Sequence, residues 1–431
     1  MKDFLGKKIT LMGLGLNGGA IEDALFFIKQ GANLTVTDLK TEEELEMPLK
    51  KIKKYNVNLT LGKHIQKDFL NADLIIKNPA VRKDSKYLAL ARSKGIKINT
   101  SIELFFELAN TKKLIGITGT KGKSTTAVLI YKIIKTKYPN TYLAGNMGVS
   151  PLKYADRAQR DIGIIELSSF QLEGLKKSPH ISVITNIGRD HLNRYKNFSD
   201  YARTKKTIFR WQDKNDILVI NNALRSVTKN AQSKVVLFSG DNIKIKNPKI
   251  HPDNISAAIH VAKIMRVSKK TYEPIIKNFK GLKGRLEYIG SINKAEIFND
   301  TTATNPMSAI NSLQNFKNKK IALIAGGEDK NLDYNEFSKN LKGVYVLALL
   351  PGSASDKIYM CGVKNKTWNP RFKKVKNLEE ALKYSLGLSP EIILLSPAAA
   401  SFNMFANEFE RGSKFADIVK KYGAKSKTFS R

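Results

Sequence analysis

Short apolar runs of β type alternate with amphipathic helical stretches along the chain, and this alternation constrains the fold more than any other feature. Strands are expected at residues 9–12, 34–37, 73–76, 113–118, 162–166, 181–186, 216–220, 295–299, 320–325, 344–349 and 391–395. Helices are expected near residues 18–30, 84–94, 123–135, 253–266 and 271–278. Because parallel strands need long crossover connections, usually helices, this rhythm predicts an α/β fold built on parallel sheets.

The alternation also divides the chain of 431 residues into modules. A fresh strand and a glycine-rich loop begin shortly after residue 101, and the alternation restarts beyond Gly281, after an irregular stretch around residues 239–252 and two helices. A chain of this length suggests about two to four domains. We therefore expect three consecutive α/β modules, at residues 1–101, 102–281 and 282–431.

Cysteine usage and the amino terminus bear on the compartment. The single cysteine, Cys361, excludes an intramolecular disulfide and a cysteine-based zinc cluster, so a reducing compartment is expected. The first residues carry charge on both sides of a short apolar segment, unlike a signal peptide. No apolar run reaches the roughly 18 residues needed to span a bilayer. The sequence predicts a cytoplasmic, soluble protein without a membrane partner.

The formal net charge of +36 invites a nucleic-acid or anionic-membrane partner, but that requires the positive charges to gather on one face or in one arm. Lysines instead recur along the whole chain, usually singly or in pairs. There is no polybasic tail and no platform of interleaved aromatic and basic residues. A lysine-biased solvated surface is favoured, and no nucleic-acid partner is expected.

The first chemical motif is a glycine-rich turn, residues 13–18 with the sequence Gly-Leu-Gly-Leu-Asn-Gly, between a predicted strand and a predicted helix. Asp38 ends the next predicted strand, about 20 residues further on. Glycines let the backbone approach a diphosphate, the helix amino terminus offers N–H donors, and a carboxylate can bind the sugar or base. Taken alone, the motif favours a nicotinamide dehydrogenase, with a turn that serves only packing as the alternative.

A second glycine-rich loop, residues 119–125, follows the apolar strand at 113–118. Such a loop wraps its amides around the phosphates of a nucleoside triphosphate. Lys123 would neutralise the β- and γ-phosphates, and the Ser124 hydroxyl can bind Mg²⁺. The position five before Gly122 is Ile117 rather than glycine, so the spacing departs from the standard phosphate loop. The predicted ATP-binding residues here are Gly119, Thr120, Lys121, Gly122, Lys123, Ser124 and Thr125.

Two further groups, Glu166 and His191, indicate a metal site. Glu166 ends the predicted strand at 162–166, and His191 follows Asp190 just after the strand at 181–186. Open α/β sheets place their ligands at the carboxyl ends of strands. Carboxylate oxygens and an imidazole suit Mg²⁺ or Mn²⁺ bridging phosphates, with a structural role for the histidine as the alternative.

Together these pieces resemble the Mur ligase family of ATP-dependent amide-forming enzymes, most closely its D-glutamate-adding branch. The resemblance covers nearly the whole chain. It rests on residues 13–18, 119–124, 145–148 (Gly-Asn-Met-Gly), 166–173 (Glu-Leu-Ser-Ser-Phe-Gln-Leu-Glu), 190–195 (Asp-His-Leu-Asn-Arg-Tyr), 284–287 (Gly-Arg-Leu-Glu), 299–305 (Asn-Asp-Thr-Thr-Ala-Thr-Asn), 326–330 (Gly-Gly-Glu-Asp-Lys) and 395–402 (Leu-Ser-Pro-Ala-Ala-Ala-Ser-Phe).

The resemblance implies a Rossmann-like amino-terminal domain that binds the UDP of the substrate, a central ATPase domain, and a Rossmann-like carboxy-terminal domain that brings the amino acid. The implied reaction transfers the ATP γ-phosphoryl group to UDP-N-acetylmuramoyl-L-alanine, and the amine of D-glutamate then attacks the acyl phosphate. This is a step of cytoplasmic peptidoglycan precursor synthesis, with two Mg²⁺ ions and with Mn²⁺ as the alternative metal. The first glycine motif is thereby reassigned, and no hydride chemistry is expected.

The resemblance also implies roles for single residues. Leu16 and Asn17 would contact the diphosphate, and Asp38 would lie near the uridine. Asn146 and His191 would face the muramoyl portion. Ser124 and Glu166 would bind one metal ion, and His191 and a carbamylated Lys205 would bind the other. Lys206 is the alternative position of the carbamylated lysine. Arg285 would stabilise the charge of the γ-phosphate, and Asn254 and Asp300 would contact the nucleoside. The pocket for D-glutamate would be formed by Thr304, Lys330, Ser401 and Phe402.

The sequence departs from the family pattern at several positions, which leaves open the exact amino acid more than the reaction class. Lys121 stands where a small or amide residue is usual, and Thr302 replaces a lysine common among D-glutamate ligases. The nearest rival is an amide ligase that adds another amino acid or acts on a folate-type substrate. A P-loop ATPase acting on nucleic acid and a dehydrogenase are the alternatives from other classes. A monomer is expected.

Overall fold

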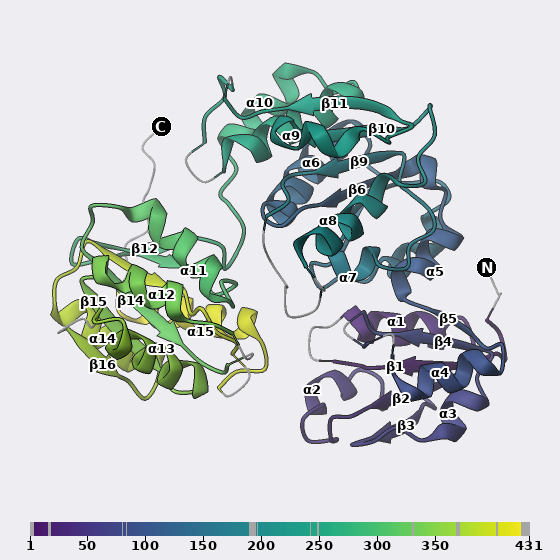
Figure 1. The fold of residues 1–431 in the computed structure, drawn as a ribbon, viewed down its shortest axis with the longest axis horizontal. Helices are drawn as coiled ribbons and strands as arrows, with labels where there is room; N and C mark the ends of the chain where they lie inside the picture. Colours follow the sequence, from purple (N-terminus) through teal and green to yellow (C-terminus); the bar gives the residue numbers. More distant parts are fainter. Residues whose placement is uncertain are drawn as a thin grey trace. The chain divides into compact units, whose positions relative to one another are not determined.

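The computed structural model describes residues 4–15, 19–79, 81–82, 84–188, 195, 197–241, 243–247, 250–329, 332–367, 371–401 and 404–423, apart from the side chain of Met47. The chain divides into two compact units, Met1–Phe279 and Lys280–Arg431. Within the described residues the strands form three sheets, two in the first unit and one in the second (Figure 1).

The first sheet has the strand order β3-β2-β1-β4-β5, and its neighbouring strands are all parallel. Its strands are β1 (Lys8–Met12), β2 (Asn33–Asp38), β3 (Asn58–Leu61), β4 (Leu74–Lys77) and β5 (Lys97–Asn99). The helices of this region are α1 (Gly19–Lys29), α2 (Glu46–Leu49), α3 (Gln66–Leu70) and α4 (Lys86–Ser93). The strand order changes direction at β1, so the loops after β1 and β4 open a crevice at the carboxyl edge of the sheet.

The second sheet has the order β11-β10-β9-β6-β8-β7 and is also parallel throughout. Its strands are β6 (Leu114–Thr118), β7 (Thr141–Gly145), β8 (Ile162–Glu166), β9 (Ile181–Ile184), β10 (Ile217–Asn221) and β11 (Lys234–Phe238). The accompanying helices are α5 (Ser101–Leu108), α6 (Lys123–Lys137), α7 (Ser169–Leu172), α8 (Phe198–Lys206), α9 (Pro252–Ile264) and α10 (Lys269–Lys277). Because β6 lies between β8 and β9, the loops after these three strands meet at one edge.

The third sheet has the order β12-β13-β17-β14-β15-β16, in which β12 is antiparallel to β13 and the other pairs are parallel. Its strands are β12 (Glu287–Ile292), β13 (Ala295–Asn299), β14 (Ile321–Gly326), β15 (Val346–Leu350), β16 (Phe372–Lys374) and β17 (Ile392–Leu395). The helices are α11 (Pro306–Leu313), α12 (Asn335–Asn340), α13 (Ser353–Lys364), α14 (Leu378–Gly387) and α15 (Glu408–Lys421).

Buried side chains explain why two sheets share the first unit. One continuous apolar cluster runs from Ile9 and Val36 in the first sheet through Phe105 of α5 to Ile165 and Ile220 in the second. In the second unit, alternate residues of β15 enter different clusters on the two faces of the third sheet, as side chains of a strand must. No helix in the described part of the chain is long and apolar enough to cross a membrane.

The expected α/β architecture is confirmed, and the interior strands lie within a few residues of their predicted positions. The same holds for the predicted helices, which correspond to α1, α4, α6, α9 and α10. The strands without a prediction are β3, β5, β7, β11, β12 and β16, and each is an edge strand of its sheet among the described residues. The module boundaries at 101 and 281 stay predictions.

Candidate functional site

The predicted phosphate loop connects β6 to α6, and two of its glycines are required by their surroundings. Gly119 has φ 153°, and a Cβ there would lie 1.9 Å from Oγ1 of Thr185. Gly122 has φ 80°, and a Cβ there would lie 2.3 Å from Oδ1 of Asn254 on α9. Only glycine fits such positions without displacing a neighbour. The predicted nucleoside residue Asn254 therefore packs directly against the loop.

Two lysines converge on the same loop. The ammonium group of Lys123 donates to the carbonyl oxygens of Gly119, at 2.9 Å, and Thr120, at 3.0 Å. The ammonium group of Lys205 on α8 donates to the Gly119 carbonyl at 2.8 Å, and its side chain is 1% exposed. The adjacent Lys206 is only half-buried. Between the two registers left open by the sequence, the structure brings Lys205 to the phosphate loop.

A group of polar side chains that the sequence did not indicate fixes the backbone of this loop. The Thr185 hydroxyl donates to the Lys121 carbonyl at 2.6 Å, and the side-chain amide of Asn186 donates to the same carbonyl at 3.0 Å. The Lys121 amide in turn donates to Oδ1 of Asn186 at 2.9 Å. The hydroxyls of Thr120 and Tyr201 lie 3.1 Å apart. The only available signal was the position of Thr185 and Asn186 just after β9.

Glu166 ends β8, next to β6 in the sheet, and its side chain is 1% exposed. Its Oε1 accepts a hydrogen bond from the side-chain amide of Asn146 at 3.3 Å. Its Oε2 is buried and has no hydrogen-bond partner among the described residues. A buried carboxylate oxygen left without a partner is costly, so this atom fits an added cation.

The donor chemistry agrees with a hard divalent cation. Ser124, in the first turn of α6, offers a buried hydroxyl near the same edge of the sheet, and Mg²⁺ prefers such oxygen donors. The described residues contain no group of three or more His, Cys, Asp or Glu side chains that could hold a metal. The predicted ligand His191 lies outside the described residues. The residues present thus fit one metal in part, through Glu166 and Ser124.

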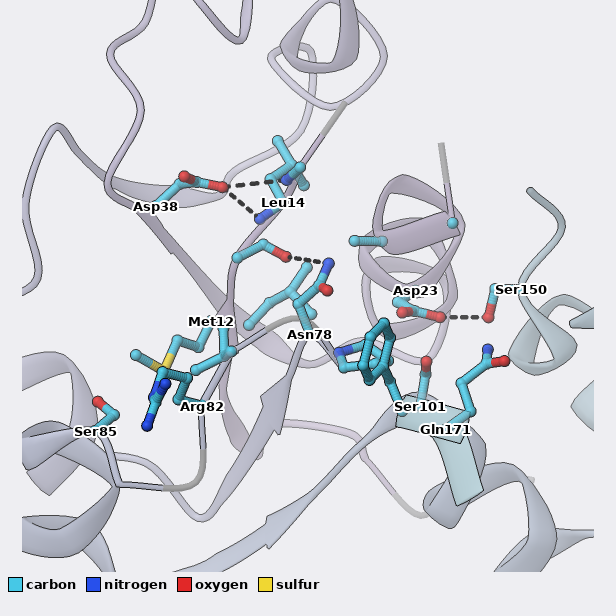
Figure 2. Close-up of a pocket in the computed structure, with 18 of the residues that line it drawn as sticks. Met12, Leu14, Asp23, Asp38, Asn78, Arg82, Ser85, Ser101, Ser150 and Gln171 are labelled. Carbon is cyan, nitrogen blue, oxygen red and sulfur yellow. Dashed lines mark hydrogen bonds between the residues drawn. The ribbon is translucent and has the colours of Figure 1, made fainter. Parts of the chain in front are cut away.

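A cavity of about 980 Å³ lies at the carboxyl edge of the first sheet (Figure 2). Part of its lining comes from the loops after β1, β2 and β4 of the first sheet. Another part comes from residues 145–151 and 168–171, which belong to the region of the second sheet. The predicted substrate residues Asp38 and Asn146 both line it. Leu16 and Asn17, predicted to bind a diphosphate, lie outside the described residues. A cavity of this size can hold a nucleotide-sized ligand.

The glycine-rich turn after β1 is held by a carboxylate. Oδ2 of Asp38 accepts hydrogen bonds from the amides of Leu14, at 2.8 Å, and Gly15, at 3.1 Å, as Figure 2 shows. Across the turn, the side-chain amide of Asn78 donates to the Gly13 carbonyl at 3.3 Å. Asp38 therefore shapes the turn itself, and its predicted contact with a uridine stays a prediction.

In the second unit, three loops that carry predicted site residues meet at the carboxyl edge of the third sheet. The backbones of Glu328 and Ala400 exchange two hydrogen bonds of 3.0 Å, and the Ala398 amide donates to the Ala303 carbonyl at 2.9 Å. These contacts join the segments that carry Thr304 and Ser401. The predicted residues Lys330 and Phe402 lie outside the described residues.

The predicted residues of this edge differ in their surroundings. Oγ of Ser401 is buried without a hydrogen-bond partner among the described residues, as a ligand-binding hydroxyl would be. Asp300 is buried and accepts hydrogen bonds from the Ser396 hydroxyl and the Leu286 amide. Burial raises the pKa of Asp300, and those hydrogen bonds oppose the shift. Arg285 is exposed, so its guanidinium is accessible to an anionic ligand.

A buried arginine that was not among the predicted site residues joins these loops. Arg411 in α15 is 1% exposed, and its guanidinium donates to the carbonyl oxygens of Thr301, at 2.9 Å, and of Ala399 and Ala400, at 3.3 Å. Burial lowers the pKa of Arg411 to about 10, so it stays protonated at neutral pH. Ala399 and Ala400 lie 12 and 11 residues before Arg411, but Thr301 lies 110 residues before it, so a local pattern does not predict that contact.

Family models match the chain in three consecutive segments. The model described as Mur ligase MurD-like, N-terminal domain matches residues 7–100. The models described as Mur ligase middle domain and as Mur ligase, glutamate ligase domain match residues 117–283 and 284–399.

Full-length relatives and solved structures agree with these matches. The UDP-N-acetylmuramoylalanine--D-glutamate ligase of Borreliella afzelii (strain PKo) is 37% identical, over 96% of this chain and 97% of its own. The protein of the same name from Clostridioides difficile (strain 630) is 32% identical, over 97% and 99%. The structure of the UDP-N-acetylmuramate-alanine ligase MurC from Thermotoga maritima aligns with a TM-score of 0.63 at 20% identity, over 96% of this chain and 99% of its own. At that identity the structural likeness shows a common fold.

Proposed function

The chain belongs to the Mur ligase family, and from that premise we infer that it joins D-glutamate to UDP-N-acetylmuramoyl-L-alanine in an ATP-dependent reaction of peptidoglycan synthesis. The observation that carries this function is the 37% identity to a ligase of that name over 96% of the chain. Lys123 at the phosphate loop and the large cavity at the first sheet provide for two of the three anionic substrates, ATP and the sugar nucleotide.

The reaction proceeds through an acyl phosphate. An oxygen of the substrate's terminal carboxylate attacks the γ-phosphorus of ATP, and the bond to the ADP oxygen breaks. The amine of D-glutamate then attacks the acyl carbon and loses a proton, and the tetrahedral intermediate expels inorganic phosphate to leave the amide. Such phosphoryl transfer depends mostly on positioning and on neutralising charge. Lys123, held at the loop by the Gly119 and Thr120 carbonyls, brings a fixed positive charge to the phosphates.

We propose that Ser124 and Glu166 hold one Mg²⁺ ion, and that His191 and a carbamylated Lys205 hold the second. When bound, such ions neutralise phosphate oxygens and orient them. The unpartnered Oε2 of Glu166 supports the first assignment, and the burial of Lys205 beside the phosphate loop supports the second. Carbamylation, the addition of CO₂ to the neutral amine with loss of a proton, would replace the lysine cation by an anionic oxygen donor. Mn²⁺ is the alternative metal.

For the remaining substrates we propose the residues that the family pattern implies. Arg285 would face the γ-phosphate, and Asn254 and Asp300 the nucleoside. D-glutamate would bind among Thr304, Lys330, Ser401 and Phe402. The buried, unpartnered hydroxyl of Ser401 and the exposed guanidinium of Arg285 support these roles. A cytoplasmic location and a monomeric state remain predictions from the sequence.

The amino acid is tested by phosphate release from ATP with UDP-N-acetylmuramoyl-L-alanine and a panel of amino acids. D-glutamate should stimulate release and L-glutamate, its match in charge and composition, should not. Stimulation by another amino acid alone would instead favour a ligase of different specificity in the same family. Turnover that depends on no amino acid would contradict the ligase function itself.

A further inference from the structure

One acidic residue in the cavity wall has no role in the chemistry described so far. Asp23, in α1 directly after the first glycine-rich turn, lines the cavity and is 5% exposed. Burial raises the pKa of Asp23 to about 7, against hydrogen bonds from Ser150 and Ser101 that lower it. A buried carboxyl group with a shifted pKa, in a cavity proposed to bind a sugar nucleotide, is a candidate functional residue.

The contacts of Asp23 lead to a single residue of the central region. The hydroxyl of Ser150 donates to Oδ1 of Asp23, and the backbone amide of Ser150 donates to Oε2 of Glu22 at 2.7 Å. Figure 2 shows Asp23 and Ser150 pointing toward one another, with Ser101 and Gln171 beside them. Two consecutive acids of α1 thus hold both hydrogen-bond donors of Ser150.

Ser150 ends a short loop, residues 145–150, that reaches the catalytic edge at its other end. The Asn146 amide donates to the Glu166 carbonyl at 2.9 Å, and the Asn146 side chain donates to Oε1 of Glu166 at 3.3 Å. Within the loop, the Gly145 amide donates to the Val149 carbonyl at 2.8 Å. Gly145, Asn146, Gly148 and Ser150 all line the cavity. The loop is therefore fastened at one end by Asp23 and Glu22 and at the other by Glu166.

We propose that Asp23 is a positioning residue for the sugar-nucleotide substrate, which by holding Ser150 fixes the loop 145–150 and keeps Asn146 between the cavity and Glu166. The proposal rests on the proposed function, since it takes the cavity as the site of UDP-N-acetylmuramoyl-L-alanine. Asp23 makes no contact with the reacting atoms in this account and acts through Ser150 and Asn146.

The alternative is that Asp23 only stabilises the junction between α1 and residues 151–157. A second contact across the same junction provides a matched control. Lys29 at the end of α1 and Gln30 just after it contact Asp156 at 3.1 Å and 3.4 Å across the same junction, and none of these residues lines the cavity. Asp156 is half-exposed, with 48% of its side chain accessible. Substituting Asp156 therefore disturbs the junction without touching the cavity wall.

The test compares Asp23→Ala, Asp23→Asn and Asp156→Ala by equilibrium titration with UDP-N-acetylmuramoyl-L-alanine and by kinetics in each of the three substrates. Asp23→Ala should weaken binding of the sugar nucleotide about tenfold, and leave the KM for ATP and D-glutamate within about twofold. Asp23→Asn keeps an acceptor oxygen for Ser150 and should restore most of the affinity. Asp156→Ala should match the unsubstituted protein in all these constants.

Several outcomes would overturn the inference. Unchanged sugar-nucleotide affinity in a folded Asp23→Ala protein would do so, as would equal effects of Asp23→Ala and Asp156→Ala on every constant. Thermal melting reports folding, and if Asp23→Ala does not fold, Ser150→Ala makes the same comparison from the other partner. Failure of the unsubstituted protein to bind the sugar nucleotide would contradict the proposed function rather than the role of Asp23.

Discussion

Two glycine-rich loops of the first unit, residues 13–15 after β1 and residues 119–122 after β6, are similar in sequence but are held by groups of opposite charge. In the first loop, the carboxylate of Asp38 accepts hydrogen bonds from two backbone amides. In the second, the ammonium groups of Lys123 and Lys205 both donate to the Gly119 carbonyl.

This difference separates two chemistries that the glycine pattern alone does not distinguish. Lys123 adds positive charge at the start of α6, where the helix dipole already favours an anion, so the second loop suits a triphosphate. Lys205 would add no cation there once it is carbamylated as proposed. At the first loop the Asp38 carboxylate occupies amides that would otherwise face an anion, and the ligand has a wide cavity instead. The neighbouring side chains, more than the glycines, decide which phosphate ligand each loop accepts.

The largest effect on the second loop is expected at Lys123. Lys123→Ala should lower kcat/KM by about 10³-fold, since it removes the positive charge proposed to neutralise the transferred phosphoryl group. Phosphate release dependent on D-glutamate measures the effect. Lys132→Ala, which removes an exposed lysine from the same helix α6, should stay near the unsubstituted rate. Turnover of Lys123→Ala close to that of Lys132→Ala would place the ATP site elsewhere.

The second lysine is expected to contribute less, and in a different way. Lys205→Ala should lower kcat about 10²-fold, because it removes the proposed carbamate ligand of a catalytic metal. Added formate or acetate should restore part of the activity by supplying the missing carboxylate. Lys206→Ala, its neighbour, should change kcat by no more than about twofold. Rescue at position 206 and none at position 205 would reverse the assignment.

The sequence predicted the interior of each sheet and not its borders, for a physical reason. Interior parallel strands such as β6 and β14 are buried along their whole length and form continuous apolar runs. Edge strands are short or partly exposed, as in β3 and β16, so their apolar signal is weak. Edge status depends on the order of strands in the sheet, which a local pattern does not contain.

The site divides along the same line. Lys123, Ser124 and Glu166 were predictable because each sits at a strand end or in a motif readable from adjacent residues. Lys205 required the family resemblance, since only the packing of α8 brings it to Gly119, 86 residues earlier in the chain. Arg411 and Asp23 were missed because their partners come from distant segments. Contacts between residues that only the fold brings together are not predictable from a local sequence motif.

At the first loop, the residue to substitute is Asp38. Asp38→Asn removes the charge and one of the oxygens that accept from the backbone, so the turn at residues 13–15 should loosen. The KM for UDP-N-acetylmuramoyl-L-alanine should rise about fivefold, with the KM for ATP unchanged as the internal control. An equal rise in both constants would mean that Asp38 acts on the stability of the whole unit.

The smallest effect is expected at Lys121, the exposed lysine of the phosphate loop. Its backbone is fixed by Asn186 and Thr185, so Lys121→Gln should leave the loop intact and remove only a charge. The KM for ATP should rise about threefold at low ionic strength, and the difference should fade with added salt, because exposed charges are screened. Steady-state kinetics at two salt concentrations measure it, with the KM for the sugar nucleotide as the unaffected reference. An effect as large as that of Lys123→Ala, or one independent of salt, would show that Lys121 contacts the triphosphate as directly as Lys123 and that the loop carries a second fixed cation.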